Sequence, residues 1–153
     1  MPSRLRVDVR IERPFRRDVS APWLRRVART ALVAEGVTAA DLGVVLTDDD
    51  AVRELNRTYA GEDASTDVLA FSLREGESFP SPDAVLPLGE VVISLPTARR
   101  QAEAAGRPLP EEVAHLLVHG ILHLLGYDHA DPAQEERMRE REMTILAQIR
   151  GEN

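Results

Sequence analysis

Hydrophobic and charged residues alternate at the start of the chain, where residues 4–12 read RLRVDVRIE and place four aliphatic side chains on one face. This period of two predicts a β-strand with one buried face. After Pro22 the apolar residues take the spacing of a helix, and Gly36 ends that helix. The first two predicted elements are therefore a strand at 4–12 and a helix at 22–35.

The same patterns continue along the chain and predict the element order βαβαββααα. Such a mixture of strands and helices is typical of an α+β domain, so we predict a single domain over residues 1–153, with a small mixed four-stranded sheet and about five helices. Residues 74–87 are rich in Gly, Ser and Pro, which predicts a loop. The further strands are predicted in 42–50, 67–73 and 88–95, and the further helices at about 51–60, 96–105, 110–126 and 132–149.

Composition limits the kind of protein that this can be. The chain has 153 residues, of which 43% are hydrophobic and 29% are charged, as in an ordinary globular domain. No apolar run approaches the roughly 18 residues that cross a membrane, and the first ten residues lack the apolar core of a signal peptide. We therefore expect a cytoplasmic protein without membrane contact. Because the chain has no cysteine, a bound metal would need nitrogen or oxygen ligands.

Charge is distributed unevenly. The net charge of −7 argues against binding of nucleic acid by the whole surface. All 19 basic residues are arginine, and nine of them lie in the first 29 residues. Such a cluster forms either ordinary solvated faces or a local surface for phosphates, whose oxygens match the guanidinium group.

All four histidines lie between residues 115 and 129, three of them in the segment HGILHLLGYDH. His119 and His123 are four residues apart, so on a helix they project from one face and can converge on one ion. Gly126 can end this helix, and the following turn can return His129 toward the same ion. Three imidazoles with one open position form the ligand set of catalytic zinc. We predict one Zn²⁺ per chain, bound by His119, His123 and His129, which would act in catalysis through a metal-bound water.

The residue after the first of these histidines distinguishes the predicted site from a peptidase site. Zinc peptidases with the same histidine spacing have a glutamate there as general base, whereas this chain has Gly120, which cannot transfer a proton. A metal site without that base suits phosphodiester hydrolysis, because a metal can activate water and polarise a phosphoryl oxygen. His115, one helical turn before His119, could line the substrate site or only the helix. Asp128 could orient a ligand imidazole or hold the turn.

Three segments resemble the YbeY family of bacterial endoribonucleases, also called rRNA maturation factors. They are HGILHLLGYDH (119–129), LNRTYAGEDASTDVLAFSL (55–73) and LGEVVISLPTARRQA (88–102). The resemblance implies a metal-dependent endoribonuclease, specific for single strands, in 3′-end maturation of 16S-type small-subunit rRNA and in ribosome quality control. Its partners would be precursor rRNA and the small ribosomal subunit. The three histidines of the first segment match the family's zinc ligands.

The central segment departs from the family pattern. The family usually has an arginine after the aromatic residue of LNxxY, where this chain has Ala60, and a basic residue two positions later, where this chain has Glu62. Arg57 is a candidate replacement for the missing cation. Thr66 and Asp67 are candidates to line the site, and the structural alternative for them is a turn before the strand. The departure leaves open a second function, a metal-containing ribosome-assembly or RNA-binding factor with weak or no nuclease activity.

Overall fold

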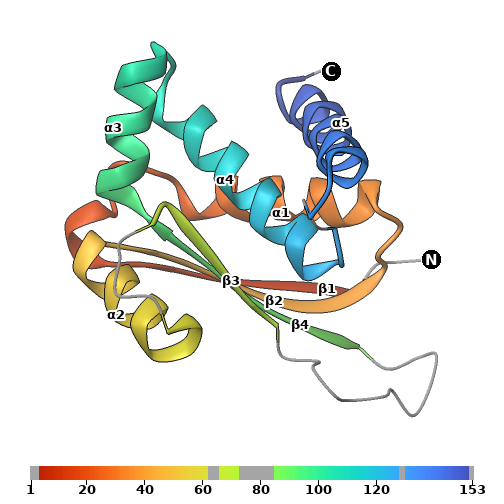
Figure 1. Ribbon diagram of the computed structural model, residues 1–153, viewed down its shortest axis with the longest axis horizontal. Helices are drawn as coiled ribbons and strands as arrows, with labels where there is room; N and C mark the ends of the chain where they lie inside the picture. Colours follow the sequence, from red (N-terminus) through yellow and green to blue (C-terminus); the bar gives the residue numbers. More distant parts are fainter. Residues whose placement is uncertain (1–3, 62–65, 73–84, 128–129, 152–153) are drawn as a thin grey trace.

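One mixed sheet forms the centre of the computed structural model, which describes residues 4–61, 66–72, 85–127 and 130–151 (Figure 1). Its strands lie in the spatial order β1-β2-β4-β3. The first three are parallel to one another and β3 is antiparallel to β4. This arrangement confirms the predicted mixed sheet. The strands are β1 (Arg4–Ile11), β2 (Ala39–Thr47), β3 (Val68–Ser72) and β4 (Leu86–Ser94).

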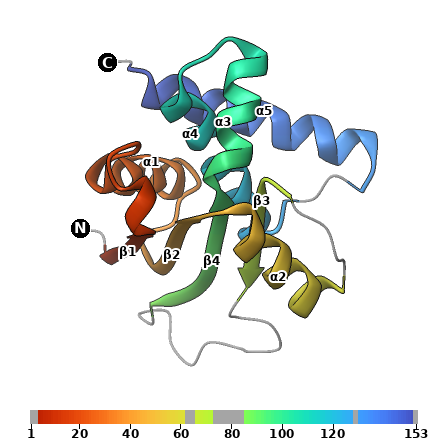
Figure 2. The same ribbon diagram turned by 90° about the vertical axis from the view of Figure 1, so that its left-hand side faces the viewer.

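The predicted order of elements and the five α-helices are confirmed within the described ranges. Four helices lie on one side of the sheet, where α5 packs on α1 and α4, and α2 lies against the other face (Figures 1 and 2). None of the described helices is long and apolar enough to cross a membrane. The helices are α1 (Ala21–Ala34), α2 (Asp49–Ala60), α3 (Leu95–Ala105), α4 (Leu109–Leu124) and α5 (Pro132–Ile149), and a short 3-10 turn, η1 (Arg13–Phe15), precedes α1.

The main core lies between the sheet and the helices, and α4 is at its centre. This helix contacts α1, α3 and α5 as well as β3 and β4. Its apolar residues are therefore buried along most of its length, including Val113, Leu117 and Ile121. Close packing of this kind restricts the movement of a helix. Side chains on α4 are thus held on a helix that is buried along most of its length.

The start of β4 differs from the prediction. The strand begins at Leu86, so the last two residues of the predicted loop 74–87 belong to the sheet, and residues 73–84 lie outside the described part. Pro87 pairs with Asp41 where the register between β2 and β4 shifts. A proline is tolerated in a strand at such an irregularity because no ladder hydrogen bond is needed from it. Composition alone therefore placed this boundary too late.

Candidate metal centre

Two of the predicted ligands lie side by side on α4. The imidazole rings of His119 and His123 have centroids 4.8 Å apart and meet edge to face at 77°. This closeness follows from their spacing of four residues on one helix. His119 is half-buried, with 30% of its side chain exposed. The pair has the chemistry and the spacing to share one ion.

Glu142 of α5 contacts two of the histidines on α4. Its Oε2 lies 2.6 Å from Nδ1 of His119, and its Oε1 lies 3.1 Å from Nε2 of His115. An ionised carboxylate only accepts hydrogen bonds, so both ring nitrogens donate. A neutral His119 with its proton on Nδ1 has its lone pair on Nε2, which is a form in which imidazole binds a metal. The donor chemistry at His119 therefore fits a zinc ligand.

The charge state of Glu142 follows from the same contacts. Burial alone would raise the pKa of Glu142, but the hydrogen bonds from His115 and His119 outweigh burial and lower the pKa to about 2. The hydrogen bond to Glu142 in turn raises the pKa of His115. Glu142 is therefore an ionised acceptor at neutral pH.

The end of α4 forms the turn that the sequence predicts. The helix ends at Leu124, and Gly126 follows with a φ of 105°. The N–H of Gly126 donates to the carbonyl of His123, and the N–H of Tyr127 donates to the carbonyl of Leu122, both at 3.0 Å. This pair of bonds is a Schellman motif, which reverses the chain after a helix.

Side chains from two other helices hold this turn. The hydroxyl of Tyr127 donates to Oε1 of Glu35 at 2.7 Å, and Nε of Arg141 donates to Oε2 of Glu35 at 2.7 Å. Burial raises the pKa of Tyr127, and the carboxylate of Glu35 adds to the effect. The turn is thus tied to the C-terminal end of α1 and to α5. The next residues, Asp128 and His129, lie outside the described residues.

Gly120 lies where α4 packs against β3 and β4 of the sheet. A Cβ atom on Gly120 would lie 2.7 Å from Cγ1 of Val91 on β4 and 3.5 Å from Cγ2 of Val68 on β3. A side chain at this position would therefore collide with the sheet. This contact explains the glycine by packing, and it leaves no room for the glutamate that a zinc peptidase has there.

The other candidate residues lie on α2 and at the start of β3. Arg57 is exposed and forms an ion pair with Glu54 at 2.5 Å. Thr66 donates to Oδ1 of Asp67 at 3.3 Å. Asp67 also accepts at its carbonyl from the N–H of Ser94, at 2.9 Å, and at Oδ2 from Gln101, at 3.3 Å. The contacts of Asp67 thus join the start of β3 to the end of β4 and to α3, while Glu62 lies outside the described residues.

In the ranges that the structure describes, no three histidine, cysteine or acidic side chains are arranged so that they could hold a metal ion. Glu142 accepts a hydrogen bond from Nδ1 of His119 and would not itself be a metal ligand. The third predicted ligand, His129, lies outside those ranges. The set of three histidine ligands thus stays a prediction. The structure describes two of them, His119 and His123 on α4.

Glu142 was missed by the sequence analysis because it follows His119 by 23 residues, and no local spacing joins them. A signal was nevertheless present in α5. Met138, Ile145 and Ile149 form its buried stripe, and Glu142 falls on the same stripe. A glutamate at a core position of an amphipathic helix indicates a buried partner.

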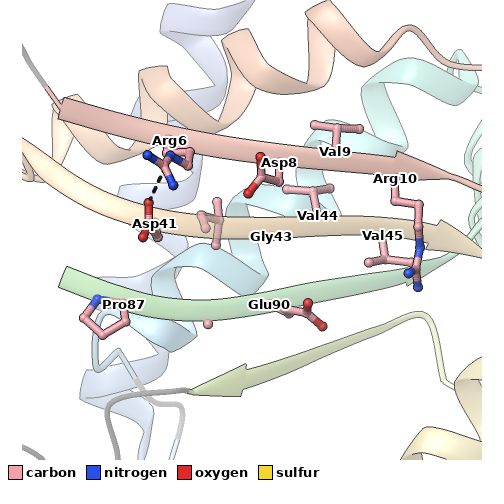
Figure 3. A pocket seen from close by; sticks show the side chains of 12 residues that line it. Arg6, Asp8, Val9, Arg10, Asp41, Gly43, Val44, Val45, Pro87 and Glu90 are labelled. Atoms are coloured by element: carbon pink, nitrogen blue, oxygen red, sulfur yellow. Dashed lines mark ion pairs between the residues drawn. The ribbon is translucent and has the colours of Figure 1, made fainter. Parts of the chain in front are cut away.

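A hollow lies on the face of the sheet that α4 does not cover. It has a volume of about 380 Å³ and is lined by charged residues of β1, β2 and β4 (Figure 3). Arg6 pairs with Asp41 at 3.7 Å, and Asp8, Arg10 and Glu90 mix further charges of both signs. Such a mixture does not favour a phosphate ligand. The histidine face of α4 is therefore the better candidate site.

The fold and the site together define a small α+β protein with metal-binding residue types on its central helix. A solved structure of the same fold is the solution structure of a protein from Thermotoga maritima, with a TM-score of 0.63 and 23% sequence identity. The alignment covers 94% of this chain and 88% of that chain. At this identity the likeness shows the fold alone.

The sequence profile of the endoribonuclease YbeY family matches residues 9–150. A relative named endoribonuclease YbeY from Moorella thermoacetica is 47% identical, over 82% of this chain and 84% of its own length. Another of that name, from Aquifex aeolicus, is 45% identical, over 90% and 87%. The chain belongs to the endoribonuclease YbeY family, and it is a hydrolase that acts on RNA. The resemblance of its three segments to this family is confirmed.

Proposed function

We propose that the protein is a zinc-dependent endoribonuclease specific for single-stranded RNA, acting in 3′-end maturation of small-subunit rRNA and in ribosome quality control. One observation supports the metal centre above the others. His119 and His123 lie together on α4, and Nδ1 of His119 donates to a buried carboxylate, which leaves Nε2 as the ligand nitrogen. Membership of an endoribonuclease family supports RNA as the substrate.

One Zn²⁺ per chain would be held by His119, His123 and His129. When bound, zinc lowers the pKa of water and polarises a phosphoryl oxygen, which is the chemistry that phosphodiester hydrolysis needs. The protein contributes two imidazoles on a helix that is buried along most of its length, and the turn at Gly126 precedes His129 in the chain. No carboxylate base follows His119, since Gly120 packs on the sheet. Proton transfer would therefore fall to a group other than the residue at position 120.

The RNA strand would pass the histidines on α4 and the start of β3, which contacts α4, while α2 contacts β3 from the other face of the sheet. Arg57, Thr66, Asp67 and His115 are the candidates to line this path. Tyr59 supports a single-stranded substrate, because 70% of it is exposed and unstacked bases stack on exposed aromatic rings.

The cellular setting of the proposal follows from the family. Precursor rRNA and the small ribosomal subunit would be the partners, and the cytoplasm would be the compartment. Residues 1–153 would act as one endoribonuclease domain. Binding of RNA would depend on salt, because phosphates release counterions when arginines bind them.

A ribosome-assembly or RNA-binding factor with weak or no nuclease activity is the second candidate. It is favoured by Ala60 and Glu62, which replace two cations of the family pattern with a neutral and an acidic residue. A missing cation would weaken the stabilisation of charge that develops during phosphodiester cleavage.

The test uses protein purified without a histidine tag and compares the parent with His123→Ala. Glu111→Gln, an exposed change on the same helix, is the matched control. We expect His123→Ala to lose zinc and the cleavage of single-stranded RNA, and the control to keep both. Zinc content equal to that of the parent would show that His123 is not a ligand. Equal cleavage by His123→Ala and parent would instead favour the binding role.

A further inference from the structure

We propose that Glu142 is a positioning residue of the metal centre, which fixes the tautomer and the ring orientation of His119, and that His115 holds Glu142 in place. This inference rests on the proposed zinc site. It assigns roles to a residue of α5 and to a histidine that is not itself a ligand.

The geometry of Glu142 supports this role because each carboxylate oxygen has its own partner. Oε2 accepts from His119 at 2.6 Å, and Oε1 accepts from His115 at 3.1 Å. The two histidines are one helical turn apart on α4, so they bracket the carboxylate. A partial rotation of the carboxylate about the Cγ–Cδ bond of Glu142 would break both hydrogen bonds. The ring of His119 is therefore held from the side opposite its ligand nitrogen.

The surroundings of Glu142 keep this contact dry. Only 8% of Glu142 is exposed, so water competes little for the carboxylate, and hydrogen bonds are stronger in such surroundings. Met138 and Ile145 flank it along the buried stripe of α5. A leucine at this position would continue the stripe, whereas a buried carboxylate is costly unless it is paired. The side chain of Glu142 is thus suited to accept hydrogen bonds from imidazoles and not to pack in the apolar core.

The chemical consequence concerns the ligand nitrogen. A carboxylate that accepts from Nδ1 keeps the proton on that atom and makes Nε2 more basic. In water, neutral imidazole side chains are free to exchange between tautomers, and only one tautomer presents Nε2 to a metal. Glu142 would therefore raise zinc affinity without touching the ion. A purely structural link between α4 and α5 would stabilise the fold but leave zinc affinity unchanged.

The experiment compares the parent with Glu142→Gln, which keeps the size of the side chain but removes its charge. Glu140→Gln is the matched control, because Glu140 is exposed on the same helix. His115→Gln tests the outer contact. Three quantities are measured for each protein: zinc affinity by competition with a chelator, the unfolding midpoint without metal, and the tautomer of His119 by nitrogen NMR of the zinc-free protein.

We expect Glu142→Gln to weaken zinc binding by about 10–100-fold and to mix the two tautomers of His119, which is a Nδ1–H tautomer in the parent. His115→Gln should weaken zinc binding in the same direction but less, and Glu140→Gln should match the parent. The NMR measurement separates positioning from stability, because a change in folding alone would not move the proton between ring nitrogens.

Two results would overturn the role of Glu142. One is a Glu142→Gln protein with the zinc affinity of the parent, even if its unfolding midpoint falls. The other is a parent in which His119 has its proton on Nε2. These results differ from failure of the zinc site itself, which would appear as a parent that binds no zinc, or as a His123→Ala protein that binds zinc as well as the parent. Either of those would overturn both proposals.

Discussion

The contact between Gly120 and the sheet predicts a specific response to Gly120→Ala. The added Cβ would lie 2.7 Å from Cγ1 and 3.1 Å from Cγ2 of Val91, whereas carbon atoms pack at about 3.5–4.0 Å. Val91 is fully buried on β4, and a β-branched side chain has little freedom to rotate away. The alanine must therefore push α4 away from the strand or strain Val91.

The expected change in the free energy of unfolding of Gly120→Ala is the difference between two effects. Overpacking of a core costs about 1–3 kcal/mol, and alanine in place of glycine stabilises a helix by about 1 kcal/mol. We therefore expect Gly120→Ala to lower the free energy of unfolding by about 0–2 kcal/mol. Val91→Ala alone should cost about 1.6 kcal/mol for its two lost methyl groups, plus a cavity contribution. When Val91 is already alanine, Gly120→Ala should instead stabilise the protein, by up to about 1 kcal/mol.

Urea unfolding of the parent, the two single variants and the double variant measures these four free energies. The double-mutant cycle should show a coupling of about 1–3 kcal/mol between positions 120 and 91. The reasoning is refuted if Gly120→Ala is more stable than the parent, or if it has the same effect whether residue 91 is valine or alanine. In either case the helix would not approach the strand as closely as the contact distances require.

Two further predictions concern the turn after α4 and the N-terminal end of α2. Tyr127→Phe should lower the free energy of unfolding by about 1 kcal/mol, because the hydrogen bond from the hydroxyl to Glu35 is lost. Zinc affinity should fall together with stability. A variant with the stability and the zinc affinity of the parent would contradict a role for this hydrogen bond. Burial alone would raise the pKa of Asp49, but hydrogen bonds from Ser94, Thr97 and Arg100 lower it to about 2 from its ordinary 3.8. Because the unfolded chain takes up this proton first, the stabilisation by Asp49 is present above pH 3.8 and is lost as pH falls toward 2. The difference in unfolding free energy between the parent and Asp49→Asn, about 1 kcal/mol at neutral pH, should shrink over that pH range. A difference that stays constant as the pH is lowered would contradict this role of Asp49.

Local patterns predicted most of the fold because each element has its own period and its own stop signals. The acids at the end of β2 illustrate this, since Asp48 accepts from the N–H of Ala51 at 2.8 Å and begins α2. The order of strands could not be predicted in the same way. β4 lies between β2 and β3, and pairing of this kind depends on contacts between distant segments.

The candidate site also has parts that local sequence patterns predict and parts that depend on distant contacts. The spacing of His119 and His123 is local, and the structure brings the two rings together. Glu142 is a distant residue on another helix, so only its place on the apolar stripe of α5 could have drawn attention to it. Gly120 was interpreted through the base that it lacks, and its contact with Val91 adds the packing reason. That contact could not be inferred before α4 was placed on the sheet.

The burial of α4 would also separate folding from uptake of the proposed zinc ion. In zinc fingers the ion replaces a core, so the apo chain unfolds. Here Leu117 and Ile121 are fully buried among apolar side chains of the helices and the sheet, independently of any ion. A protein built in this way would remain folded when zinc is scarce and could be reactivated when zinc returns. Its activity could then follow the zinc supply of the cell while its abundance stays constant.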